Sequence, residues 1–396
     1  MNNQVSERLQ KMSTSATLAM AAKARSLKND GVDVIGLSLG EPDFDIPDFI
    51  KEAAKQAIDE NYSSYTPVDG YADLKEAIIH KFKRDNQIDY TANSIVVSTG
   101  AKQSLYNVAM VVLNKGDEVI LPAPYWVSYS DIVKLAEGVP VEVPTSIEND
   151  FKMTAEQLEA AINDKTRMLW FSSPCNPSGS FYSKEELEAL AQVLKKHPDI
   201  IVVSDEIYEH INFSSGGHTS FATIEGMQDR TVTVNGVSKA FAMTGWRIGY
   251  IGAPEWIARA CNKLQGQVTS GANAIAQRAV ITALQESPSR IQYMVDEFKQ
   301  RRDLVLQRLN DIQGFKVNVP EGAFYVFPDI SYFFGKTLKN KQIANASDFA
   351  LYLLEEAHVA TVTGEAFGNP DCIRISYAAS EKELLEALRR IEEAVS

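Results

Sequence analysis

Cysteine, histidine and basic charge are all scarce in this sequence. The 396 residues include three cysteines and five histidines, and the formal net charge is −13. The cysteines show no CxxC or metal-ligand spacing, which favours reduced thiols in a cytoplasmic protein over disulfides. The histidines form no metal-binding pattern either, so we expect no metal. An acidic chain without a basic segment is not expected to bind nucleic acid or an anionic membrane surface.

Long apolar runs are also missing. No stretch approaches the roughly 20 apolar residues that a membrane-spanning helix needs. Residues 1–15 are polar and lack the apolar centre of a signal peptide. We therefore expect a soluble, cytoplasmic protein. The hydrophobic content of 45% is enough for a large core divided between two or three domains.

Short β-rich runs alternate with helix-like segments from about residue 45 to 255. The expected strands are 95–98, 117–121, 141–143, 168–171, 200–203, 231–234 and 248–251. Strands separated by helices predict βαβ units and a mainly parallel sheet. Capping-box patterns predict helix starts at Thr154, Ser183 and Ser380.

The pattern changes after Pro288. A long charged helix is expected at 290–309, followed by short strands at 324–327 and 373–376. These elements predict a smaller α+β domain, joined by the segment near the N-terminus. We therefore divide the chain into an N-terminal arm (1–14), a small domain (15–45 plus 290–396) and a large domain (46–289).

The most informative segment is 238–247, Ser-Lys-Ala-Phe-Ala-Met-Thr-Gly-Trp-Arg. It places Lys239 just after a β-rich run and ends in Arg247. A lysine amine can form a Schiff base with an aldehyde, and an arginine can bind a phosphate through two hydrogen bonds. Pyridoxal 5′-phosphate carries both groups on one ring. The pair alone is weak evidence, because most lysines and arginines are solvated surface residues.

Other polar residues follow the predicted strands, where ligands bind in an open α/β sheet. Gly100, Ala101 and Lys102 open a helix after the strand at 95–98, and backbone N–H groups there can face an anion. Turn glycines of this kind are common, so the pattern has little specificity.

Two further polar residues lie at strand ends. Asn176 follows the strand at 168–171, where a simple Asn-Pro turn is the alternative. Asp205 follows the strand at 200–203 and could cap a following helix. A buried aspartate could instead keep a pyridine nitrogen protonated, so that the ring accepts electrons.

Together these segments resemble the class I aminotransferases, which are fold-type I pyridoxal-phosphate enzymes. The motifs are Gly-Glu-Pro-Asp-Phe (40–44), Asn-Pro-Ser-Gly (176–179), Ser-Asp-Glu-Ile-Tyr (204–208), the lysine segment (238–247) and Arg-Ile-Ser-Tyr (374–377). The resemblance covers nearly the whole chain. It is closest to the bacterial aspartate aminotransferases that open with Ser-Ala-Thr, here 15–17. It implies a large domain with a seven-stranded, mainly parallel sheet between helices.

The resemblance implies a role in cofactor binding for each matching residue. Lys239 would hold pyridoxal 5′-phosphate as a Schiff base and later move the proton at the substrate Cα. Asp205 would pair with the pyridine nitrogen, Asn176 and Tyr208 would hydrogen-bond the phenolic oxygen, and Trp126 would stack on the ring.

The resemblance also implies a phosphate site. Arg247 and the helix start after Gly100 (the amides of Ala101 and Lys102) would bind the phosphate. Tyr65 would reach the phosphate of a partner subunit, which implies a homodimer. Many relatives carry a serine where this chain has Gly236, and Ser238 could compensate.

The substrate contacts follow from the same resemblance. Arg374 would bind the α-carboxylate, the backbone near Gly40 would close over it, and Trp126 and Asn176 would line the substrate site. Lys102, with hydroxyls from Ser15 and Thr17, would bind a second carboxylate. The alternative for Lys102 is a helix-start lysine that faces solvent.

The expected reaction is a ping-pong transfer of an amino group from an L-amino acid, aspartate foremost, to 2-oxoglutarate. Aromatic or broad specificity is the alternative, and prephenate is disfavoured because Ser13 replaces a lysine of prephenate-accepting relatives.

A pyridoxal-dependent C–S lyase or cyclopropane-forming synthase would share the lysine. A regulatory protein with an added DNA-binding domain is not expected, because the pattern begins within the first 20 residues. A non-catalytic structural role would leave the lysine and its partners without a use.

Overall fold

Seven strands form one large sheet in the computed structural model, which describes residues 5–396. The sheet order is β2-β8-β7-β6-β5-β3-β4. The strands are β2 (Ile95–Ser98), β3 (Glu118–Ala123), β4 (Val139–Pro144), β5 (Thr166–Ser172), β6 (Ile201–Asp205), β7 (Thr231–Gly236) and β8 (Gly249–Gly252). β8 is antiparallel to both of its neighbours, and the other pairs are parallel. The predicted seven-stranded, mainly parallel sheet is confirmed.

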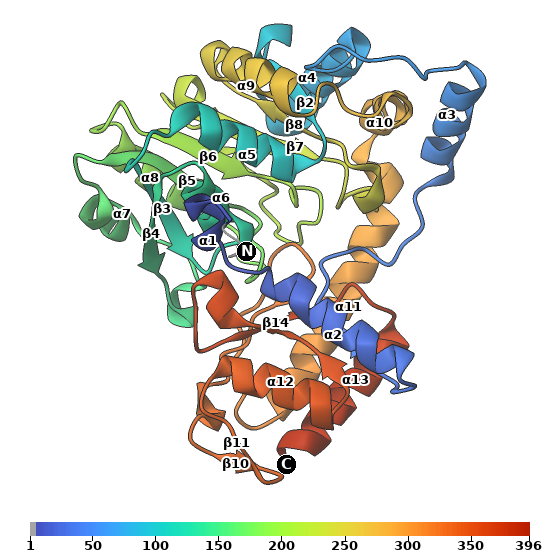
Figure 1. Cartoon of the computed structure of the whole chain (residues 1–396), viewed down its shortest axis with the longest axis vertical. Helices are drawn as coiled ribbons and strands as arrows, with labels where there is room; N and C mark the ends of the chain where they lie inside the picture. The colour runs from blue at the N-terminus through green and yellow to red at the C-terminus, as the bar shows by residue number, and fades with distance from the viewer. Residues whose placement is uncertain (1–4) are drawn as a thin grey trace.

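Helices cover both faces of this sheet, in the upper part of Figure 1. They are α3 (Asp48–Asp59), α4 (Ala72–Asn86), α5 (Ala101–Val112), α6 (Ser128–Leu135), α7 (Ala155–Ala161), α8 (Lys184–Leu194), α9 (Glu255–Val268) and α10 (Ala274–Gln285). Successive strand residues face opposite sides of a sheet. Trp170 packs into the core beneath α5, α6 and α9, while its neighbours Leu169 and Phe171 pack against α8. This two-sided burial explains why the strands read as continuous apolar runs.

The lower part of Figure 1 combines the segment that begins with α2 and the C-terminal part of the chain. Its helices are α2 (Ala16–Asn29), α11 (Gln292–Asp311), α12 (Ala346–Glu356) and α13 (Glu381–Val395). Its strands are β1 (Ile35–Gly36), β9 (Tyr325–Val326), β10 (Thr337–Leu338), β11 (Lys341–Gln342), β12 (Val359–Ala360), β13 (Val362–Thr363) and β14 (Ile373–Ser376). β13, β14 and β9 form an antiparallel sheet, and β1 pairs with β12. The N-terminal segment therefore lies against C-terminal elements, although the predicted domain limits stay a prediction.

Local sequence signals placed three helix starts correctly. The predicted capping boxes at Thr154, Ser183 and Ser380 are present and begin α7, α8 and α13. The long helix begins two residues later than expected, because a short 3₁₀ turn at Pro288–Ile291 precedes it. A four-residue helix, α1 (Glu7–Gln10), lies against α6. Within residues 5–396 no helix is long and apolar enough to cross a membrane.

Gly249 allows β8 to pack against the first residue of α5. A Cβ atom at Gly249 would lie 2.1 Å from the backbone nitrogen of Ala101. We predict that Gly249→Ala lowers the free energy of unfolding by about 1–3 kcal/mol, because backbone atoms must move apart. Urea unfolding followed by circular dichroism measures this. Gly216→Ala is the matched control, since nothing lies within 4 Å of its added methyl group; equal effects of the two changes would contradict the prediction.

Candidate active site

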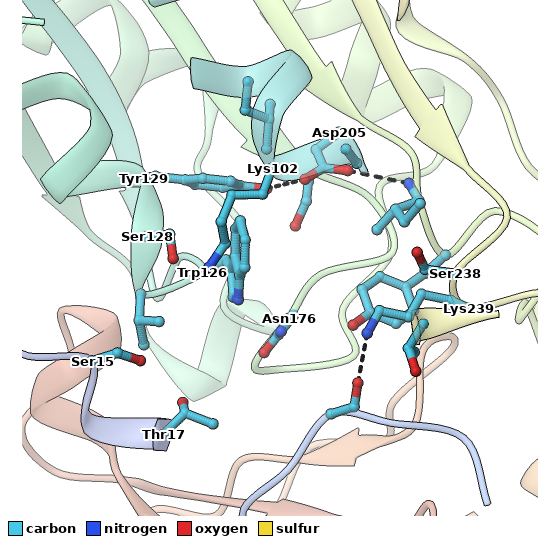
Figure 2. Close-up of a pocket in the computed structure, with 18 of the residues that line it drawn as sticks. Ser15, Thr17, Lys102, Trp126, Ser128, Tyr129, Asn176, Asp205, Ser238 and Lys239 are labelled. Atoms are coloured by element: carbon cyan, nitrogen blue, oxygen red, sulfur yellow. Dashed lines mark hydrogen bonds between the residues drawn. The ribbon is translucent and has the colours of Figure 1, made fainter. Parts of the chain in front are cut away.

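A cavity of about 320 Å³ opens at the carboxyl edge of the large sheet, where the lower part of the molecule meets it. Figure 2 shows the side chains converging on this space from several strand ends. The lining includes these residues singled out from the sequence: Ser15, Thr17, Gly40, Ala101, Lys102, Trp126, Asn176, Asp205, Tyr208, Ser238, Lys239, Arg247 and Arg374. Parallel strands bring their ends to one edge, which explains why residues far apart in the chain meet there.

Two of the predicted residues are not in the cavity lining. Gly100 lies behind it, with a φ of +82° that favours glycine. A Cβ atom there would lie 2.3 Å from an Arg247 guanidinium nitrogen, so Gly100 makes room for that side chain. Tyr65 is fully exposed on the surface, at 100% of its accessible area.

Lys239 follows the end of β7 and is only partly exposed. Its amine donates a hydrogen bond of 2.5 Å to the carbonyl oxygen of Gly40, which connects the lysine to the lower part of the molecule (Figure 2). Burial, followed by the nearby charge of Arg374, lowers the pKa of Lys239 to about 8. The neutral amine that a nucleophile or a base requires therefore forms at a lower pH than in an exposed lysine.

Asp205 is the last residue of β6 and is buried. The Tyr129 hydroxyl donates to one carboxylate oxygen at 2.7 Å, and the backbone N–H of Ile207 donates to the other at 3.2 Å. Burial raises the pKa of Asp205 to about 6, against the lowering effect of the Tyr129 hydrogen bond. The helix-cap alternative is wrong, because residues 207–210 form a turn and no helix follows Asp205 directly.

A cationic cradle lies at the start of α5. Arg247 approaches the backbone at Gly100, and Ser238 also lines the cavity. The first N–H groups of a helix have no partner within the helix, so those of Ala101 and Lys102 can bind an anion. Burial, followed by the charge of Arg247, lowers the pKa of Lys102. An anion of two negative charges would suit this cradle.

Backbone packing accounts for the glycine at position 236. A Cβ atom at Gly236 would lie 3.0 Å from both the Cα of Gly249 and the carbonyl oxygen of Ile248. These contacts are tighter than ordinary van der Waals packing. A serine here would therefore force the neighbouring strand β8 to shift.

Arg374 lies on β14 and is 1% exposed. Its two terminal nitrogens donate to the side-chain oxygen of Asn176 at 2.9 Å and to the carbonyl oxygen of Ser38 at 2.6 Å. Its Nε atom has no hydrogen-bond partner within residues 5–396. A buried donor without a partner is costly, which indicates that a ligand acceptor such as a carboxylate completes the group.

Lys102 points over the indole ring of Trp126, with Nζ 4.6 Å from the ring centroid. Ser15 and Thr17 lie across the cavity from this pair, at the beginning of α2 (Figure 2). Lys102 lines the cavity but remains exposed to solvent, so its role in carboxylate binding stays a prediction.

Sequence reasoning gave no role to five polar residues of the lining: Ser128, Tyr129, Ser172, Thr244 and Tyr325. Tyr129 lies three residues after Trp126, so helical spacing could have indicated it. Tyr325 donates to or accepts from the Tyr208 hydroxyl at 2.8 Å. No local signal marks Tyr325, because only the pairing of β9 with β14 brings it here.

Acidic residues and histidines also gather beside β6, outside the cavity. The two sets with ligand atoms within 4.8 Å of one another are Asp85, Glu209, His210 and Glu206, Glu209, His218. The Lys81 ammonium pairs with Glu209, and His218 donates to or accepts from Glu206 at 2.9 Å. Lys81 thus neutralises the carboxylate that both sets share. The expected absence of a metal stays a prediction.

The cavity holds a largely buried lysine and a buried aspartate at the edge of a mainly parallel sheet, together with arginines from both parts of the molecule. This arrangement defines an α/β enzyme that acts on anionic substrates. Residues 32–391 match the family model described as aminotransferase class I and II. The chain belongs to this family and is an aminotransferase, as the motifs predicted.

Individual relatives match along the full length of the chain. The aspartate/prephenate aminotransferase of Cereibacter sphaeroides is 50% identical, and the alignment covers 98% of each protein. The aspartate aminotransferase structure from Rhizobium meliloti is 46% identical with a TM-score of 0.96, over 99% of this chain and 98% of that one. The Thermus thermophilus aspartate aminotransferase solved with maleate is 41% identical with a TM-score of 0.93, over 99% and 100%.

The lowered pKa of Lys239 predicts a pH-dependent stability difference from a Lys239→Met variant. Below pH 8 the lysine is charged in both states, and burial of that charge destabilises the folded protein. Between pH 8 and the ordinary value of 10.5 the folded state loses the proton first, so this destabilisation disappears. The methionine variant should be the more stable protein at pH 7, and the gap should narrow towards pH 10. Urea unfolding of ligand-free protein measures it; a gap that is independent of pH would contradict the prediction.

Proposed function

We propose that this aminotransferase moves the amino group of L-aspartate to 2-oxoglutarate, with pyridoxal 5′-phosphate as cofactor and by a ping-pong sequence. The observation that carries the proposal is the convergence of Lys239, Asp205 and Arg374 on one cavity, with Lys102 also in its lining. The names of relatives support the substrate, since the Cereibacter sphaeroides protein is an aspartate/prephenate aminotransferase. Maleate, in the Thermus thermophilus structure, is a dicarboxylate like aspartate.

The residues of the cavity fit this cofactor. Arg247, Ser238 and the first amides of α5 would hold the phosphate, because the cradle offers positive charge and free N–H donors. Asp205 would pair with the pyridine nitrogen, and a cation beside it would keep the carboxylate ionised. Asn176 and Tyr208 would reach the phenolic oxygen, and Trp126 would cover one ring face. When bound, the cofactor supplies an aldehyde for the amino group and a ring that withdraws electrons from the substrate Cα.

Lys239 would serve first as the attachment point and then as the base that removes the Cα proton. Its lowered pKa makes the neutral amine available, and the Gly40 carbonyl orients that amine by accepting its hydrogen bond. Burial around the amine excludes water, which keeps the proton between Lys239 and the substrate.

The two carboxylates of the substrate would bind at opposite ends of the cavity. Arg374 would bind the α-carboxylate, with its free Nε as one donor and Asn176 holding the guanidinium in place. Lys102 would bind the second carboxylate, assisted by the hydroxyls of Ser15 and Thr17. The charge pair at the buried Arg374 would be stronger than the same pair in water.

We propose the active form to be a homodimer in the cytoplasm. Tyr65 supports this proposal, because a fully exposed aromatic side chain is free to reach a second subunit. Its hydroxyl would complete the phosphate site of the partner. Analytical ultracentrifugation, and loss of cofactor affinity in Tyr65→Phe, test this arrangement.

Prephenate is the second candidate amino acceptor, because the Cereibacter sphaeroides relative carries it in its name. Ser13 replaces the lysine of prephenate-accepting relatives, and its backbone N–H donates to Asp131 at 3.3 Å. A substrate panel of aspartate, glutamate, tyrosine, phenylalanine and prephenate separates these specificities. Pyruvate and ammonia from cystathionine would instead indicate a C–S lyase.

We predict that Lys239→Ala abolishes both the cofactor's visible absorbance band and the formation of oxaloacetate from aspartate and 2-oxoglutarate. The variant loses the amine that binds the cofactor and moves the proton. A coupled malate dehydrogenase assay follows oxaloacetate. Lys382→Ala, which removes an exposed lysine of α13, is the control and should keep full activity. Near-normal turnover of Lys239→Ala would refute the proposed function.

Lys102→Ser should reduce kcat/KM for aspartate by about 10- to 100-fold, the effect of losing one charge-assisted hydrogen bond. The kcat/KM for phenylalanine should change little, because an apolar side chain does not need the ammonium. Steady-state kinetics with both donors measure the ratio. Lys115→Ser, an exposed lysine just beyond α5, is the control. An unchanged ratio in Lys102→Ser would rule out a carboxylate role for Lys102.

A further inference from the structure

Tyr325 is a fully buried tyrosine in the wall of the cavity, and it belongs to the lower part of the molecule. It lies on β9, where it pairs in register with Ser376 of the neighbouring strand β14. That strand also carries Arg374. Buried tyrosines need a partner for their hydroxyl group, and the hydroxyl of Tyr325 finds its partner on the opposite wall.

We propose that Tyr325 is a positioning residue that connects the two sides of the site. Its ring supports the carboxylate-binding arginine, and its hydroxyl supports the cofactor side. The proposal rests on the proposed function, because it assigns Tyr325 a role in the chemistry of Tyr208 and Lys239. Three separate contacts of this one side chain carry it.

The first contact fixes the plane of Arg374. The guanidinium carbon lies 4.6 Å from the centroid of the Tyr325 ring and 4.9 Å from that of Phe367. Aromatic faces attract a guanidinium, and more strongly where water is excluded. With Asn176 and the Ser38 carbonyl fixing its terminal nitrogens, the arginine is held before any carboxylate arrives.

The second contact crosses to the large sheet. The hydroxyl oxygens of Tyr325 and Tyr208 are 2.8 Å apart, and either could be the donor. Burial raises the pKa of both tyrosines, so both keep their protons. A phenol has only one proton to donate. Whenever Tyr208 donates its proton into the cavity, Tyr325 must therefore donate to Tyr208. Such a chain strengthens the outer hydrogen bond, because each donor polarises the next.

The third contact is with the backbone at Gly40. A Cβ atom there would lie 2.0 Å from the Tyr325 hydroxyl oxygen, so any side chain at position 40 would displace the phenol. The carbonyl of the same glycine accepts the hydrogen bond from Lys239. The Tyr325 hydroxyl thus packs against the segment that orients the lysine, as well as against Tyr208.

These contacts give the ring and the hydroxyl different tasks. The ring supports Arg374 and hence carboxylate binding. The hydroxyl supports donation by Tyr208 to the phenolic oxygen of the cofactor. That donation draws electrons from the ring and lowers the pKa of the Lys239–cofactor linkage. Loss of the hydroxyl alone should therefore alter the titration of the linkage without weakening substrate binding.

The test is a double-mutant cycle on the absorbance titration of the holoenzyme in the absence of substrate. Tyr325→Phe should raise the titration midpoint of the Lys239–cofactor band by about half a pH unit, the effect of losing a net hydrogen bond of about 0.7 kcal/mol. In a Tyr208→Phe background the same change should have no effect, because the chain is already broken. An unshifted midpoint in Tyr325→Phe, or an equal shift in both backgrounds, would overturn the proposal.

Steady-state kinetics separate the two tasks. In Tyr325→Phe, kcat should fall while KM for aspartate stays within about twofold, because the ring beneath Arg374 remains. In Tyr325→Leu, KM should rise as well. A purely structural role would instead lower thermal stability in both variants and leave the titration midpoint unchanged, which would overturn the proposal.

Two controls keep the outcome decisive. If Tyr325→Phe does not fold, the same titration is made on Tyr325→Leu, which also lacks the hydroxyl, and an unshifted midpoint there would overturn the proposal. The two proposals also fail differently. An unmodified protein that forms no absorbance band with pyridoxal 5′-phosphate would refute the proposed function, whereas a normal band with an unshifted Tyr325→Phe midpoint refutes only the role of Tyr325.

Discussion

The constraint on which this site depends is the burial of charged side chains around one cavity. Lys239, Asp205 and Arg374 are largely removed from water, and burial is the main cause of the pKa shift of each. Charges in such a place are costly unless a partner compensates them. One fixed dipole compensates each charge. The Gly40 carbonyl accepts from the lysine, the Tyr129 hydroxyl donates to the aspartate, and the Ser38 carbonyl accepts from the arginine.

Two parts of the fold must meet for this arrangement to exist. The strand ends of the large sheet supply Asp205 and Lys239, while β14 supplies Arg374 and the segment after β1 supplies the Gly40 carbonyl. The large sheet supplies the amine and the carboxylate, and the other part supplies the guanidinium and the carbonyl that accepts from the amine. Under the proposed function, such a cavity would bind the carboxylate of an amino acid on one side of the junction and its amino group on the other.

The sequence predicted the architecture well because local signals agree with the final packing. Apolar runs between capped helices specify the large sheet, and the three capping boxes begin helices where expected. Tertiary context decided the remainder. Residues 207–210 form a turn and no helix follows Asp205 directly, although its carboxylate accepts from the Ile207 N–H as a helix cap would. The lining residue Tyr325 carries no local signal, since strand pairing alone brings it beside Arg374.

The sequence by itself determined the order of the strands along the chain, the lysine segment and the family to which the chain belongs, because these depend on residue type and spacing. Only the tertiary structure decided which polar groups meet, as in the pairing of Tyr208 with Tyr325 and of Lys239 with the Gly40 carbonyl. The physical reason is that these contacts join residues more than a hundred positions apart. Their distances are fixed by strand register and by packing between the two parts of the fold, which no local pattern encodes.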